Sequence, residues 1–97
     1  MVIAACRVTL LLPENHSLKG KRQALRSILA RLRNEYGVTA AEVEAQDLWQ
    51  RAVIGIAYVS NEASHANEVV SKAVNFIERA RGDVELLDYE LEILYPF

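Results

Sequence analysis

Residue types that commonly support catalysis, metal binding or cross-linking are scarce in this chain of 97 residues, which has one cysteine, two histidines and four glycines. The single cysteine, Cys6, excludes an internal disulfide and a cysteine-based zinc cluster, and its apolar surroundings predict a buried, inert thiol. The histidines have no neighbours spaced like metal ligands, and "LKGKR" lacks the glycine-rich start of a phosphate-binding loop. The sequence therefore predicts no metal, no cofactor and no catalytic residues.

Long uncharged segments are also missing. No run approaches the ~20 apolar residues that a helix needs to cross a bilayer. The apolar start "MVIAACRVTLLLP" has no basic leader and is interrupted by Arg7, unlike a signal peptide. We therefore expect a cytoplasmic protein that does not contact a membrane.

Acidic residues are absent from the segment Ser17–Arg33, "SLKGKRQALRSILARLR", which holds six of the eleven basic residues. The net charge of the whole chain is −2, so the rest of the sequence is strongly acidic. This distribution predicts one basic surface on an otherwise acidic protein.

The apolar periodicity predicts four strands and two helices. Strands are expected at 2–12, 38–45, 51–60 and 84–94. Two helices are expected after the N-cap residues Ser17 and Asn61, and Gly37 and Gly82 are expected to end them. Strict alternation in 38–45 places Glu42 and Glu44 on the same face of the sheet.

The order βαββαβ in residues 1–97 predicts a single domain of the α+β class. Two split βαβ halves most simply form a ferredoxin-like sandwich, in which a four-stranded antiparallel sheet carries both helices on one face. The first and third strands are central in that fold, and the apolar third strand, "RAVIGIAYVS", agrees with this position.

The segments that carry the most specific similarity are "SLK.KR" at Ser17–Arg22 and "QDLWQRA" at Gln46–Ala52. Through them, and over nearly its whole length, the chain resembles the bacterial YlxP-like family, a small domain of unknown function. The resemblance implies a ferredoxin-like fold without an established activity. Genes of that family often lie among translation and ribosome-maturation factors, which implies a role related to RNA. The family usually has a glutamate in place of Gly20, where it would complete a capping box with Ser17.

The basic segment is the main candidate site. On a helix, Lys19, Arg22, Arg26 and Arg33 form one stripe beside the apolar face, with Lys21 on the opposite flank. Cations in a first helical turn oppose the helix dipole at a typical cost of ~0.3–1 kcal/mol each. A bound phosphate would reverse that cost, which favours an anion or RNA site. The alternative is a solvated flank, or one paired with acids of the second helix such as Glu62, Glu68 and Glu78.

The loop "QDLWQR" is the second candidate site. Trp49 and Arg51 suit contact with a base or a protein partner. Alternatively, Trp49 folds back on the hairpin while Asp47 pairs with Arg51.

The open face of the predicted sheet is expected to display Glu42, Glu44, Asp88, Glu90 and Glu92. These acids exclude base stacking across that face as in an RNA-recognition motif. Ile3, Arg7 and Leu11 share the face, which indicates either a self-association surface or an ordinary solvated one.

Taken together, the sequence predicts a non-catalytic accessory protein that binds RNA or the ribosome through its basic first helix. The alternative is a homodimeric protein-interaction module whose basic helix meets an acidic protein partner.

Overall fold

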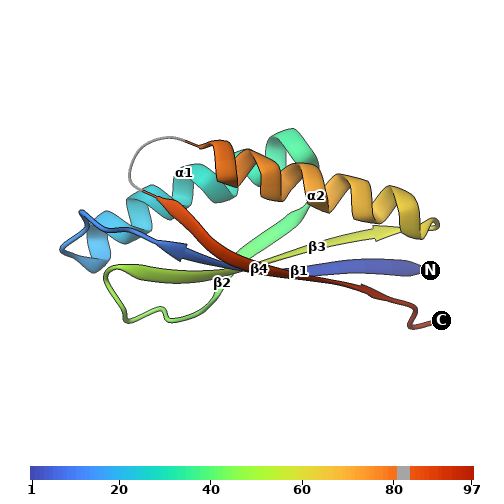
Figure 1. Cartoon of the computed structure of the whole chain (residues 1–97), viewed down its shortest axis with the longest axis horizontal. Coiled ribbons are helices and arrows are strands. Elements are labelled where there is room, and N and C mark those ends of the chain that lie inside the picture. Colours follow the sequence, from blue (N-terminus) through green and yellow to red (C-terminus); the bar gives the residue numbers. More distant parts are fainter. Residues whose placement is uncertain (81–83) are drawn as a thin grey trace.

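The computed structural model describes residues 1–80 and 84–97. The elements follow in the order β1 (Val2–Leu11), α1 (Leu18–Tyr36), β2 (Thr39–Glu44), β3 (Arg51–Ser60), α2 (Ala63–Arg79) and β4 (Glu85–Leu94). The strands form one antiparallel sheet in the order β2-β3-β1-β4, and both helices cover the same face of it (Figure 1). This arrangement confirms the predicted ferredoxin-like α+β fold with β1 and β3 at its centre.

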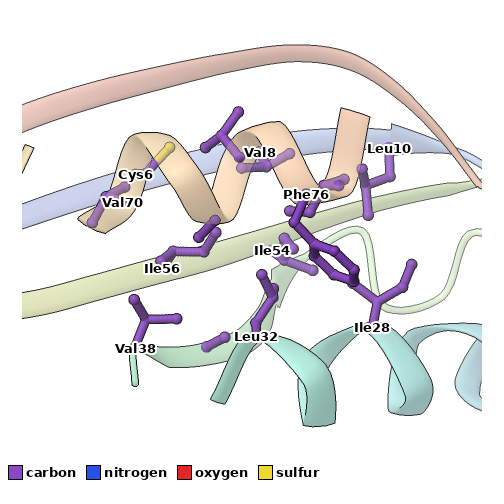
Figure 2. Close-up of a cluster of buried hydrophobic side chains, with 14 of the residues drawn as sticks. Cys6, Val8, Leu10, Ile28, Leu32, Val38, Ile54, Ile56, Val70 and Phe76 are labelled. Carbon is purple, nitrogen blue, oxygen red and sulfur yellow. The ribbon is translucent and has the colours of Figure 1, made fainter. Parts of the chain in front are cut away.

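The core lies between the sheet and the two helices. Alternate residues of β1, including Cys6, Val8 and Leu10, point into it, as the even-numbered apolar pattern predicts. They meet Ile54 and Ile56 of β3 and the inner stripes of the helices (Figure 2). The buried apolar residues of the helices are Leu25, Ile28, Leu32, Ala66, Val70, Ala73, Val74, Phe76 and Ile77.

The ends of α1 are set by local sequence. The Ser17 hydroxyl accepts a hydrogen bond from the Gly20 amide at 3.0 Å, and Gly37 adopts the left-handed conformation that closes the helix. The predicted cap of α2 is wrong: Glu62 occupies the N-cap position without a side-chain hydrogen bond. The Ser60 hydroxyl instead accepts from the Glu62 amide, one residue before the helix begins. The predicted stop at Gly82 lies outside the described residues.

A β-bulge in β2 overturns the predicted alternation of its two glutamates. Glu42 pairs with Ile54, whereas Glu44 pairs with Val53, so Val43 is an extra residue in the ladder. Glu42 keeps the regular register of the preceding residues and lies on the helix side of the sheet with buried Ala40, whereas the extra residue moves Glu44 to the open side. The prediction that both acids share the open face is therefore wrong.

The two ends of the chain lie at the same end of the molecule (Figure 1). Val2 pairs with Ser60 and Ile3 pairs with Leu94 at this end, whereas Leu11 pairs with Arg51 at the far end of β1. The loop between β1 and α1 and the loop between β2 and β3 therefore meet far from both termini.

Candidate functional site

On the first half of α1, three cations of the basic segment are exposed: Lys19, Arg22 and Arg26. No carboxylate within residues 1–80 and 84–97 forms an ion pair with any of them, including the acids of α2. Arg31, in contrast, pairs with Glu35 and lies over the ring of Phe76. The structure thus leaves a basic surface, defined here as Lys19, Arg22 and Arg26, on the first half of α1.

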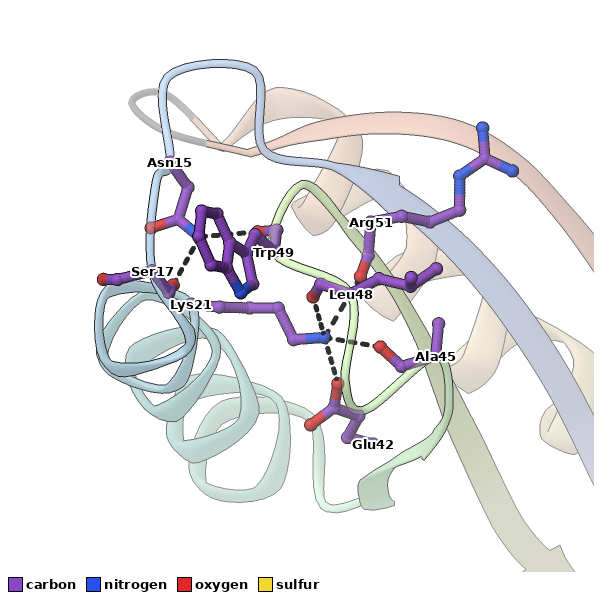
Figure 3. A network of polar contacts seen from close by, with 8 residues as sticks. All are labelled: Asn15, Ser17, Lys21, Glu42, Ala45, Leu48, Trp49 and Arg51. Atoms are coloured by element: carbon purple, nitrogen blue, oxygen red, sulfur yellow. Dashed lines mark hydrogen bonds and ion pairs between the residues drawn. The ribbon is translucent and has the colours of Figure 1, made fainter.

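Lys21 is not part of this surface, so its predicted contact with RNA is wrong. Its side chain is 1% exposed, and its ammonium donates to the carbonyls of Ala45 and Leu48 at 2.7 Å and of Arg51 at 3.1 Å. The Glu42 Oε2 lies 2.8 Å from the same nitrogen but outside hydrogen-bond geometry, since the three protons are directed at the carbonyls (Figure 3). Lys21 therefore holds the β2–β3 loop against the start of α1.

Two features of the backbone build the pocket of Lys21. On α1 this residue falls in line with Leu25, Ile28 and Leu32, on the helix face that the core covers. Glu42 alternates with buried Ala40 on the helix side of β2, and after the bulge Ala45, with φ 60°, bends the chain in the left-handed region. Three carbonyls of the following loop then converge on the ammonium.

Arg33 is also separate from the basic surface. Its guanidinium donates to the Ala40 carbonyl from Nε at 3.1 Å and from Nη2 at 2.6 Å, which joins the last turn of α1 to β2. It lies about two helical turns beyond Arg26. The predicted stripe of four cations is therefore reduced to three.

The β2–β3 loop is also held from the side. The Asn15 amide donates to the Trp49 carbonyl at 2.5 Å and to the Ser17 carbonyl at 2.7 Å. The side-chain amide of Gln50 donates to the carbonyls of Pro13 and Asn15, and the backbone carbonyl of Gln50 accepts from the backbone amide of Leu12 at 2.9 Å. The loop backbone is consequently fixed beside the N-cap of α1, although sequence reasoning singled out neither Asn15 nor Gln50.

Trp49 and Arg51 leave this loop in different directions. The Trp49 residue is 53% exposed and lies beside Asn15 at the start of α1, so it is not folded into the hairpin (Figure 3). The Arg51 side chain extends away from Trp49, and its pairing with Leu11 places it on the open face of the sheet. Of the two loop residues predicted as contacts, only Trp49 lies at the start of α1, the helix that carries the basic surface.

Gly20 packs closely against this loop system. A Cβ atom at position 20 would lie 2.4 Å from Asn15 Oδ1 and 3.2 Å from the Ser17 hydroxyl. Any larger residue here, including the glutamate expected from the resemblance, would have to displace the Asn15 side chain. A cavity of about 390 Å³ beside it is lined by Leu12, Glu14, Asn15, Gly20, Gln23 and Ala24.

The open face of the sheet is hollow and mostly apolar. Its cavity of about 930 Å³ lies over Ala5, Ala41, Val43, Gly55 and Ala57. Arg7 at its floor contacts Glu90 at 2.5 Å and Glu44 at 3.5 Å, and the hydrogen bond and charge of Glu90, then the charge of Glu44, raise the pKa of Arg7. At one end of the face, register places Ile3 beside Val59 and Leu94.

Within residues 1–80 and 84–97, no group of three His, Cys, Asp or Glu side chains is placed to hold a metal ion. None of the described helices is long and apolar enough to span a membrane. The Cys6 thiol is buried, and desolvation raises its pKa to about 11.

Comparison with known proteins agrees with the suspected resemblance. Residues 3–91 match the model of the family described as "Protein of unknown function (DUF503)". The chain is also similar to the "Uncharacterized protein YlxP" of Bacillus subtilis (strain 168), with 39% identity over 62 residues that cover 64% of this chain and 67% of that protein. The match over almost the entire fold shows that this chain belongs to the DUF503 family of YlxP-like proteins, whose function is unknown.

Proposed function

We propose that this protein is a non-catalytic accessory factor that binds RNA, with ribosomal RNA as the first candidate. The observation that carries the proposal is the basic surface of Lys19, Arg22 and Arg26, which no described carboxylate neutralises. Three cations along one helix flank suit successive phosphates of an RNA backbone.

The position of these cations strengthens the argument. Lys19 lies in the first turn of α1, which contains no acidic residue, and Arg22 follows one turn later. The helix dipole disfavours positive charge there, whereas a phosphate at this end is stabilised by both the dipole and the side chains. Within the basic segment, Lys21, Arg31 and Arg33 make contacts inside the fold, which leaves the other three cations of the segment for a partner.

The first test is RNA binding at low salt, followed by co-sedimentation with ribosomal subunits. A Lys19→Glu, Arg22→Glu variant should lose binding. A Lys72→Glu, Arg79→Glu variant on α2 makes the same change in net charge and should retain it.

Salt dependence provides a second measure. With three phosphate contacts at ~0.7 each, the log–log slope for single-stranded RNA is expected near roughly −2. If the wild type binds no RNA at low salt, or if both charge variants lose affinity equally, the basic surface is not an RNA site.

The open face favours a second candidate, a homodimer. Its apolar cavity and the exposed Val43, Val59 and Leu94 are typical of a surface that associates with another protein surface. In this alternative the basic helix would meet an acidic protein partner. Sedimentation analysis of the isolated chain, and competition between RNA and polyglutamate for the basic surface, separate this candidate from the first.

A further inference from the structure

The β2–β3 loop is held rigidly from two directions. On the side that faces α1, the Lys21 ammonium donates to the carbonyls of Ala45, Leu48 and Arg51. From the side, Asn15 binds the Trp49 carbonyl and Gln50 binds the loop before α1. The backbone around Trp49 is therefore fixed by several hydrogen bonds, one set of which requires a buried charge.

This scaffold keeps a large aromatic side chain in water. Trp49 is 53% exposed, although tryptophan is highly buried on average in folded proteins. A rigid aromatic has few rotatable bonds, so a ligand that stacks on it loses little conformational entropy of the protein. An exposed tryptophan on an anchored backbone has the properties of a preformed stacking surface.

Trp49 lies near the N-cap of α1, the helix that carries the basic surface. The Asn15 amide donates to both the Trp49 carbonyl and the carbonyl of Ser17, the N-cap of α1 (Figure 3). Lys19 and Arg22 follow within the first turn and a half of the same helix. The exposed aromatic side chain and the exposed cations therefore belong to the same end of the molecule, around the start of α1.

Single-stranded RNA combines the two groups that this path would bind. Its bases present free aromatic faces next to a phosphate backbone, whereas a duplex keeps its bases stacked inside. We propose that Trp49, on the loop held by Lys21 and Asn15, stacks on an unpaired base while Lys19 and Arg22 bind phosphates of the same strand. This inference rests on the proposed RNA-binding function and specifies single-stranded RNA as its ligand class.

The experiment uses the full chain and two probes with a comparable number of phosphates: a 12-nucleotide oligouridine, and a blunt RNA hairpin whose two strands are joined by a non-nucleotide linker so that no base is unpaired. Trp49 is the only tryptophan, so its fluorescence reports on this site alone. Oligouridine should quench that fluorescence and the hairpin stem should not. Trp49→Ala should weaken oligouridine binding about five-fold to a hundred-fold, the range for loss of one base–aromatic stack. Hairpin affinity should change by less than about two-fold.

Two further variants make the outcome decisive. Trp49→Phe, which keeps an aromatic face, should restore most of the affinity, and thermal melts of both Trp49 variants check that the fold is intact. Lys19→Glu, Arg22→Glu should weaken both probes. If Trp49→Ala binds oligouridine as tightly as the wild type while the charge variant fails to bind, the stacking inference is wrong but the RNA-binding proposal stands. If the wild type binds neither probe, both are wrong.

Discussion

Lys21 shows how one residue can connect three parts of the fold. Its ammonium lies between α1, the bulged strand β2 and the loop that follows it. A buried charge is tolerated only where its protons and its countercharge are both satisfied, and here three carbonyls and Glu42 do so. Lys21 thus stabilises the conformation of a loop, and its positive charge does not indicate a binding site.

Replacing Lys21 by methionine should destabilise the protein by about 3 kcal/mol or more, because the Glu42 carboxylate and three carbonyls lose their partner. A Lys21→Met, Glu42→Leu variant should recover about 1 kcal/mol of that loss, since the stranded carboxylate is gone while the carbonyls stay unpaired. Urea denaturation of both variants gives the two values. Lys19→Met, at an exposed position, is the control and should change stability by less than about 0.5 kcal/mol. Equal losses in the single and double variants would contradict the role given to Glu42.

Cys6 should make the protein less stable at alkaline pH. Burial raises the pKa of this thiol from 9.0 to about 11, so the unfolded chain loses its proton first. Below pH 9 the thiol is protonated in both states and has no effect. Between pH 9 and 11 the free energy of unfolding should fall more steeply for the wild type than for Cys6→Ala. Urea denaturation across that range measures both slopes, and identical slopes would contradict the prediction.

At the scale of elements, the start of α1 is held by a close contact between Gly20 and Asn15. Glycine inside a helix costs roughly 0.5–1 kcal/mol relative to alanine. The structure explains why glycine is present despite this cost: the Asn15 side chain occupies the space that a Cβ atom on residue 20 would need. The same side chain anchors the loop that carries Trp49 through its hydrogen bond to the Trp49 carbonyl.

A double-mutant cycle tests this contact. In an Asn15→Ala background, Gly20→Ala should stabilise the protein by about 0.5–1 kcal/mol. In the wild-type background the gain should be smaller or reversed, because the new methyl group must displace Asn15 from its two hydrogen bonds. Denaturant melts of the four proteins give the coupling energy. Additive effects would show that Asn15 moves aside at no cost.

The helices and strands differ in how much of their structure the sequence predicts. The bounds of α1 are predicted by Ser17 and Gly37, because capping is decided by neighbouring residues. The bulge in β2 is not predicted, since the segment Thr39–Glu44 reads as a regular alternation and the shift appears only in its pairing with β3. The burial of Lys21 depends on the helix-side position of Glu42, which the prediction placed on the open face. A helical projection places Lys21 on a flank of the apolar stripe. It cannot show that Glu42 and three backbone carbonyls lie next to the ammonium.

At the scale of the whole molecule, the two candidate surfaces lie on different sides of the sheet. The basic surface belongs to α1 in the helical layer, whereas the apolar cavity lies on the uncovered face (Figure 1). If both surfaces are used, association of two chains through the open face leaves each basic surface free. Dimerisation and the binding of a short RNA should then be independent.

A Val59→Asn, Leu94→Asn variant tests this independence without changing the net charge. Both residues lie beside Ile3 on the open face, and Val59 is 60% exposed. Sedimentation equilibrium should give twice the chain mass for the wild type and the single mass for the variant. The affinity of each chain for a 12-nucleotide RNA should stay within about two-fold. A wild type that sediments as a monomer at high concentration would remove the open face as a dimer interface.

The shared position of the chain ends has a practical consequence for all of these measurements. β1 has ten residues, which at about 3.3 Å each separate its start from its end by roughly 30 Å. Met1 and Phe97 are both at the end away from Trp49 and the N-cap of α1. A tether, purification tag or dye attached at either end would therefore leave that region facing the solution, so an immobilised protein would present it to a flowing ligand.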